Sequence, residues 1–392
     1  MNSKPQSDNP STDSSLLLLD NPILLSPTNF TPLSRTPWAG SALASTYKSQ
    51  VVDSPDMRIG ESWEFSCSSE SPSRLAQDPS KTLSNIMRLD APRSISLDAA
   101  NLGLVESDIL VKLLNADAPL SLQIHPADSH PALTHNECGK PETWLILDAA
   151  PGAGLFLGFS QKFALDELRR HLVANTFDPK WLQFVPVNKG DYFEIGPGVP
   201  HAIGPSLVIL EPQRVLPGKS GKTWRLWDWN RKYNSNGDLD QVTGSPRHLN
   251  INESLSILSM ETQVGPSFVD SLRRFPLIHR EPGIVISTFP SNGHYQVVHG
   301  IMQEGATIEF QPECLYGAFT LLKGNGEFQG NRSTAISFGY TAFLPNKCLP
   351  VIYKARSVLS EWTLVIPTTK DDTSTRNIFK RISAAKVTTK PL

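Results

Sequence analysis

The chain has 392 residues, of which 36 are basic and 38 acidic, so its formal net charge is −2. This near balance gives no electrostatic reason to expect nucleic acid or an anionic membrane as the main partner. No stretch approaches the roughly 18 consecutive apolar residues that a membrane-spanning helix needs. The hydrophobic share of 39% is enough for a sizeable core, and the length suggests two or three domains.

Four cysteines, at positions 67, 138, 314 and 348, form no CxxC pair and no framework spacing. We therefore expect free thiols in a reducing compartment. The apolar run at 16–19 is too short for the core of a signal peptide, and no other targeting signal is evident. These observations predict a cytoplasmic protein.

Short apolar or alternating runs, bounded by Gly, Pro, Asn and Asp, dominate the chain. They predict β-strands at 109–114, 120–125, 143–147, 191–195, 206–211, 307–310, 318–323, 341–344 and 362–366. Helical spacing is confined to 81–89, 252–259 and 161–173, the last with Ser160 as its N-cap. The pattern favours a mainly β protein of sandwich or barrel type with a few short helices, and disfavours a parallel α/β fold.

The elements divide into two barrel-like units between polar ends. We expect a disordered leader at 1–15, an N-terminal domain at 16–264 that includes helical insertions and a linker, and a C-terminal domain at 265–367. Residues 368–392 form a polar and then basic tail.

The segment PLSLQIHP at 119–126 carries the first chemical signal. On a strand, Ser121, Gln123 and His125 share one face while Leu122 and Ile124 point into the core. Polar groups in such a setting need partners, and a metal would supply one, since Gln oxygen and His nitrogen both suit Zn²⁺. A solvent-facing strand that happens to contain these residues is the alternative.

Two further segments place ionisable side chains at strand starts. Glu142 begins a strongly apolar strand, with Lys140 two residues earlier, so the pair is either a surface ion pair or directed into a site. GPG at 196–198 predicts a tight turn that joins two strands as a hairpin and brings His201 near the barrel mouth. An ordinary hydrogen-bonded histidine is the alternative.

After Glu211, three tryptophans at 224, 227 and 229 are interleaved with Arg225 and other charged residues. Strand alternation would place Arg225 on the same face as Trp227 and Trp229. An arginine in this setting is typical of anion recognition, and arginine stacked on tryptophan as simple packing is the alternative.

In order and spacing, these segments resemble the short bacterial-type class I mannose-6-phosphate isomerases of the cupin superfamily. The resemblance covers most of the chain from about 35 to 366 and weakens over the last hundred residues. It is carried by PWAG (37–40), IGESWEFS (59–66), LVKLLNADAPLSLQIHPAD (110–128), KPETW (140–144), GDYFEIGPGVPHAIG (190–204) and TWRLWDWNR (223–231), with RHLNINESLSI (247–257) extending it.

The resemblance implies a tandem cupin with a catalytic N-terminal unit. The second unit shows no HxH or QxH near 307–310 and no histidine at 344–350, so we expect it to be metal-free and structural. The resemblance implies interconversion of mannose 6-phosphate and fructose 6-phosphate by proton transfer through an enediolate. It also implies one zinc ion per chain, held by Gln123, His125, Glu142 and His201.

The family's active-site arginine falls on Arg225, but the loop after Glu211 is longer than in the short forms, so Arg214 is a rival. By the same resemblance, Ser121 and Lys112 are candidates for the phosphate end of the substrate. Lys140 and Glu211 are both candidates for proton transfer, and the sequence does not rank them.

The implied partner is a small sugar phosphate, and family members are often monomers. A regulatory cupin that binds sugar phosphate without turnover remains an alternative, and an isomerase assay separates the two. An iron-dependent cupin dioxygenase is a third reading, which Gln123 disfavours because such enzymes usually carry two closely spaced histidines on the first strand.

Overall fold

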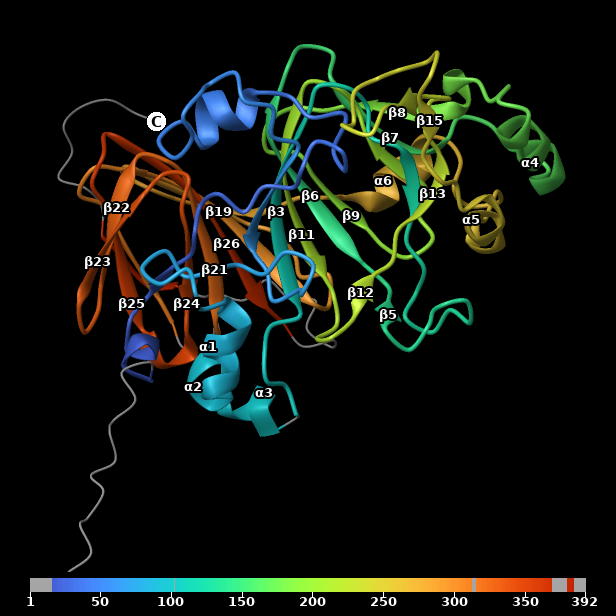
Figure 1. The fold of residues 1–392 in the computed structure, drawn as a ribbon. Helices are drawn as coiled ribbons and strands as arrows, with labels where there is room; N and C mark the ends of the chain where they lie inside the picture. Colours follow the sequence, from blue (N-terminus) through green and yellow to red (C-terminus); the bar gives the residue numbers. More distant parts are fainter. Residues whose placement is uncertain (1–15, 102, 312–314, 369–378, 384–392) are drawn as a thin grey trace, which may run out of the picture.

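The computed structural model describes residues 16–101, 103–311, 315–368 and 379–383. Its strands form two β units that lie side by side, the first drawn mainly in teal to yellow and the second mainly in orange to red (Figure 1). The structure is mainly β, as predicted, and each predicted strand segment overlaps a strand of the structure. The predicted leader at 1–15 lies outside the described residues.

The first unit packs a six-stranded sheet against a five-stranded sheet. The larger sheet runs in the order β16 (Arg273–Arg274), β9 (Tyr192–Ile195), β6 (Glu142–Ala149), β11 (Leu207–Arg214), β3 (Ile109–Ala116) and β2 (Glu61–Phe65). The smaller sheet runs in the order β13 (Trp224–Trp227), β4 (Leu122–Ile124), β10 (His201–Ile203), β7 (Gly154–Phe159) and β8 (Leu182–Pro186).

The six-stranded sheet is buried on both faces, which explains the continuous apolar runs of its central strands. Along β6, Trp144 and Ile146 pack into the interior of the first unit, whereas Leu145 and Leu147 pack into a core shared with the second unit. A strand covered on both sides gains stability from apolar residues at every position, whereas a half-solvated strand would alternate.

The second unit pairs a seven-stranded sheet with a five-stranded one. The former runs β1 (Ile23–Leu24), β24 (Thr341–Leu344), β21 (Gly317–Lys323), β26 (Leu359–Pro367), β19 (Tyr295–Gln303), β18 (Ile284–Thr288) and β17 (Leu277–Glu281). The latter runs β23 (Ser333–Ser337), β22 (Asn325–Gln329), β25 (Val351–Ala355), β20 (Thr307–Phe310) and β27 (Phe379–Ser383), so part of the predicted tail adds a strand.

Chain segments cross between the units at both ends. β1 joins the sheet of the second unit, and β16 pairs with β9 in the first. Lys48 and Glu64, both fully buried, form an ion pair at 2.6 Å, and Thr341 of the second unit donates a hydrogen bond to Glu64. The division at 264/265 stays a prediction, although the pairing of β16 extends the first sheet to Arg274.

Short elements complete the first unit. The hairpin β14 (Lys232–Tyr233) and β15 (Ser245–Pro246) and the parallel pair β5 (Glu137–Cys138) and β12 (Ser220–Gly221) lie outside its main sheets. The α-helices are α1 (Leu83–Leu89), α2 (Ala91–Ile95), α3 (Leu97–Asn101), α4 (Leu165–Val173), α5 (Ile251–Ile257) and α6 (Pro266–Leu272). Among the described residues, none of these helices is long and apolar enough to cross a membrane.

Two local predictions are wrong. Helix α4 begins at Leu165 after Ala164, and the Ser160 hydroxyl instead donates to the Lys180 carbonyl, so Ser160 is not its N-cap. The turn at 196–198 does not form a hairpin, because β9 and β10 lie in different sheets. The chain crosses from one sheet to the other there, with Gly198 at φ +80°.

Candidate active site

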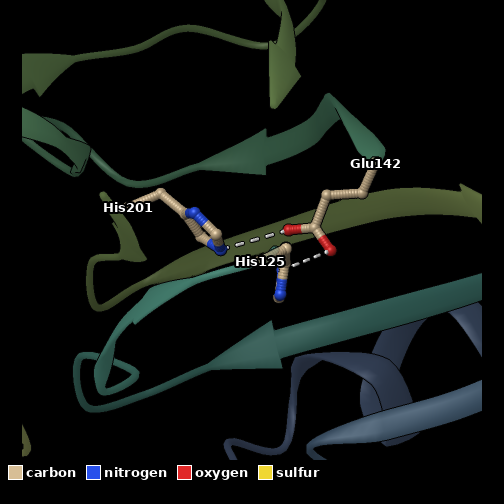
Figure 2. A group of neighbouring side chains, drawn as sticks. All are labelled: His125, Glu142 and His201. Carbon is tan, nitrogen blue, oxygen red and sulfur yellow. Dashed lines mark ion pairs between the residues drawn. The ribbon is translucent and has the colours of Figure 1, made fainter. Parts of the chain in front are cut away.

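Three buried side chains converge inside the first unit, each from a different strand or strand end (Figure 2). Their ligand atoms all lie within 4.8 Å of one another. His125 Nε2 lies 3.2 Å from one oxygen of Glu142, and His201 Nε2 lies 3.4 Å from the other. Two imidazoles and a carboxylate, brought together from residues 125 to 201, form a compact set of donor atoms for a divalent metal.

Backbone carbonyls fix the orientation of both imidazoles. His125 Nδ1 lies 3.1 Å from the Lys222 carbonyl, and His201 Nδ1 lies 2.8 Å from the Val199 carbonyl. Each Nδ1 therefore carries the proton, which leaves the lone pair of each Nε2, at 3.2 and 3.4 Å from Glu142, free to bind a metal. His125 Nε2 is buried and has no hydrogen-bond partner of good geometry. Coordination to a metal ion would satisfy this nitrogen.

The electrostatics of the cluster keep the donor atoms in their metal-binding forms. Burial lowers the pKa of His125, and burial together with His125 lowers the pKa of His201 to about 3, so both rings are neutral at pH 7. Burial alone would raise the pKa of Glu142, but His125 and Lys140 hold it well below its usual range. Neutral imidazoles beside an ionised carboxylate are what a zinc ion binds.

A row of side chains across the five-stranded sheet places Gln123 and Arg225 beside this cluster. Gln123 on β4 is paired with His201 on β10 and with Arg225 on β13. Residues paired in this way have neighbouring side chains on the same face of the sheet. Gln123 Nε2 donates to Ser121 Oγ at 3.2 Å, and Arg225 Nε donates to the same hydroxyl at 3.2 Å.

A cavity of about 380 Å³ adjoins the cluster. Its wall includes Gln123 and also Lys140, whose Nζ lies 3.7 Å from Glu142. Lys112, Arg225 and other cationic side chains also line it. The volume and the excess of cations suit a small anionic ligand.

The two predicted proton-transfer candidates differ in access. Lys140 lines the cavity, whereas Glu211 is buried and is not among the lining residues described. Trp144 and Gln213 donate hydrogen bonds to the two oxygens of Glu211, at 3.0 and 2.7 Å. Burial, together with the charge of Glu142, raises the pKa of Glu211 to about 8.

The two candidate arginines differ in the same way. Arg214 forms a two-pronged ion pair with Asp128, at 3.0 and 2.6 Å, and is not among the residues that line the cavity. Arg225 lines the cavity and lies close to Arg247, and burial followed by that second positive charge lowers the pKa of Arg225 to about 10.

Lys112 is held in place from several sides. It forms ion pairs with Glu61 at 3.5 Å and Glu211 at 3.9 Å, and lies over the Trp63 ring at 4.5 Å from its centroid. Although burial alone would lower the pKa of Lys112, these carboxylates raise it. The ammonium group is therefore a fixed positive charge at the cavity wall.

Several residues of the site were missed by sequence reasoning. Trp38 and Trp63 form the aromatic part of the cavity wall, whereas Trp227 packs into the apolar cluster around Phe177. A shift in strand register between Arg225 and Trp227 breaks the predicted alternation. The remaining missed residues are Glu61, Gln213 and Arg247.

Fold and site together define a class: a two-unit β protein with a buried centre of two histidines and a carboxylate beside a cationic cavity. A known structure with this fold is the mannose 6-phosphate isomerase of Bacillus subtilis, with a TM-score of 0.69 at 21% identity over 88% of this chain and 99% of that one. A zinc-bound mannose 6-phosphate isomerase gives a TM-score of 0.62 at 15% identity over 88% of this chain and 99% of that one.

Sequence comparison gives the family. No protein-family model matches the chain. The mannose-6-phosphate isomerase of Streptococcus mutans is 34% identical over 239 residues, which are 61% of this chain and 68% of the relative. A Bacillus subtilis mannose-6-phosphate isomerase is 30% identical over 229 residues, 57% of this chain and 64% of the relative. The chain belongs to the mannose-6-phosphate isomerase family of enzymes, as the sequence resemblance predicted.

Proposed function

We propose that the protein interconverts mannose 6-phosphate and fructose 6-phosphate with the help of one zinc ion. The observation that carries the proposal is the convergence of His125, Glu142 and His201 beside a cavity lined by Lys140 and Arg225. The names of its relatives support the substrate, and the zinc-bound relative supports the metal.

The zinc ligands in this proposal are the three converging residues together with Gln123, which is paired with His201. The donor set fits the metal, because both Nε2 atoms lie within 3.4 Å of a Glu142 oxygen and the buried His125 Nε2 lacks a hydrogen-bond partner. When bound, zinc supplies Lewis acidity toward the C1 and C2 oxygens of the sugar, an effect worth several kcal/mol.

Isomerisation requires a proton to move from C2 to C1 and another from O2 to O1, through an enediolate. We assign the carbon-to-carbon transfer to Lys140, because it reaches the cavity and lies near Glu142. Glu211 instead fixes Trp144 and Lys112 from behind the cavity wall. General acid–base catalysis of this type contributes about 10²–10⁴-fold.

Arg225 stabilises the negative charge that develops on the enediolate oxygens. Its guanidinium lines the cavity, and the Ser121 hydroxyl and the His248 carbonyl accept two of its hydrogen bonds. Held in this way, it loses little entropy when the charge forms. Lys112 lines the cavity and serves the phosphate end of the substrate, and Trp38 and Trp63 exclude water from part of the cavity. Ser121, the other predicted candidate for the phosphate end, is buried and is not among the described lining residues; its hydroxyl instead holds Gln123 and Arg225 in place.

An isomerase assay that detects fructose 6-phosphate, combined with zinc quantification, tests the proposal. We expect about one zinc per chain, loss of turnover after chelation, and recovery when zinc is restored. A zinc-loaded protein that binds mannose 6-phosphate without turnover would instead support the regulatory binder. Iron in place of zinc would support the dioxygenase reading.

A further inference from the structure

Gln213 connects two buried carboxylates inside the first unit. Its Nε2 donates one hydrogen bond to Glu142 Oε2 at 2.8 Å and another to Glu211 Oε2 at 2.7 Å. All three side chains are buried, and Gln213 has no exposed surface. The primary amide has two N–H groups, and both are used, one for each carboxylate.

Strand register explains how one amide reaches both acids. Gln213 on β11 is paired directly with Glu142 on β6, so their side chains lie next to each other on one face. Glu211 lies two residues earlier on β11, and residues two apart on a strand share a face. The three polar groups are therefore fixed by two rigid central strands of the six-stranded sheet.

The orientation of the amide follows from its neighbours. Gln213 Oε1 is buried and has no hydrogen-bond partner. The reverse orientation would direct this acceptor at the ionised Glu142 carboxylate, which offers no proton, and would leave the N–H groups unpaired. An unsatisfied buried oxygen costs stability, so an apolar residue would suit a purely structural position better.

We propose that Gln213 is a positioning residue, which holds the Glu142 carboxylate in the orientation that binds the metal and keeps it apart from Glu211. The inference rests on the proposed metal centre. One Glu142 oxygen lies toward each histidine (Figure 2), and the bond from Gln213 fixes the plane of that carboxylate. Partners that orient a ligand in this way typically change metal affinity by 10–100-fold when removed.

The test is Gln213→Met, which keeps the side-chain length and apolar bulk but removes both N–H donors. Zinc affinity is measured by competition with a chromophoric chelator, and ligand geometry by the visible absorption of the cobalt-substituted protein. We expect zinc affinity to fall about 10–100-fold, the cobalt bands to shift, and kcat to fall more than KM rises.

Gln296 offers a matched control in the second unit. It is also fully buried, donates through Nε2 to the Phe289 carbonyl at 3.0 Å, and has an unpartnered Oε1. Gln296→Met should leave zinc affinity and the cobalt spectrum unchanged. Should Gln213→Met fail to fold, Gln213→Asn retains the amide on a shorter stem that cannot reach both acids, and it should show the same loss of affinity.

Equal zinc affinity and identical cobalt spectra in wild type and the folded Gln213 variant would overturn this inference while leaving the proposed function intact. A wild-type protein that binds no divalent metal would overturn both. A wild-type protein that binds zinc but does not isomerise mannose 6-phosphate would overturn the proposed function alone, because the affinity comparison requires no substrate.

Discussion

The two β units share an architecture but fill their interiors differently. Inside the first, residues such as His125, Glu142 and Gln213 form a buried polar cluster. Inside the second, Trp362 lies among Phe310, Phe319 and other rings, with centroids 5.6 and 5.2 Å away. Aromatic packing stabilises a barrel, whereas buried polar groups cost stability unless they are paired. The comparison suggests that the second unit supports a first unit whose interior is committed to chemistry.

Removing the carboxylate of the polar interior should have the largest effect. Glu142→Ala takes away the group that both histidines face, so we expect zinc to be lost and activity to fall by about 10⁴-fold or more. Zinc per chain and the isomerase rate measure this. Glu309→Ala in the second unit is the control. Retained zinc with normal turnover would show that the ligand set is wrong.

Lys140→Met should separate chemistry from metal binding in the same interior. We expect kcat to fall about 10²–10⁴-fold while zinc content stays at the wild-type level, because Lys140 faces the cavity and is not a proposed ligand. Lys180→Met, at an exposed position in the first unit, is the control. If Glu211→Gln loses more turnover than Lys140→Met, the assignment of proton transfer is reversed.

Arg225→Ala should reduce kcat by about 10²–10³-fold without loss of zinc. This is the typical cost of removing one hydrogen-bond donor that stabilises a developing oxyanion. Steady-state kinetics with zinc analysis measure the effect. Arg214→Ala breaks the ion pair with Asp128 and should act on stability rather than turnover. Near-normal turnover in the Arg225 variant, together with a large loss in the Arg214 variant, would exchange their roles.

The aromatic interior is best probed with Trp362→Ala, which removes a fully buried indole from the second unit. We expect the free energy of unfolding to fall by about 3–5 kcal/mol, because the cavity left behind closes only partly. Denaturant unfolding measures this loss. Zinc per folded chain should not change, and a weaker metal site in this variant would mean that the second unit shapes the first unit's centre.

A smaller effect concerns the ion pair that joins the two units. Burial alone would raise the pKa of Glu361, but His299 and Lys189 outweigh it and lower this pKa to about 2. A pKa below the unfolded value means stability that is present above about pH 4.5 and is lost as the pH falls toward 2. Glu361→Gln should therefore cost about 1–3 kcal/mol in urea unfolding at pH 7 and less at pH 2.5. A pH-independent difference would contradict this origin.

Much of the site could be predicted because its signals are local. Alternation at 121–125 placed Ser121 and Gln123 on one face, and both have their side chains within hydrogen-bond reach of each other. Lys140 and Glu142 are neighbours as their spacing suggested. Period-two spacing from Glu211 also places Gln213 on the same face of its strand, so the local pattern contains a signal for this residue as well.

By itself, the sequence determined the strand composition, the mainly β class and the residue types available to bind a metal, because alternation and side-chain chemistry are properties of short segments. Only the tertiary structure decided that β9 and β10 lie in different sheets, that Arg214 is held by Asp128 while Arg225 faces the cavity, and that Gln213 reaches two acids. These outcomes depend on contacts between residues far apart in the chain, which sheet pairing and register fix and which no local pattern specifies.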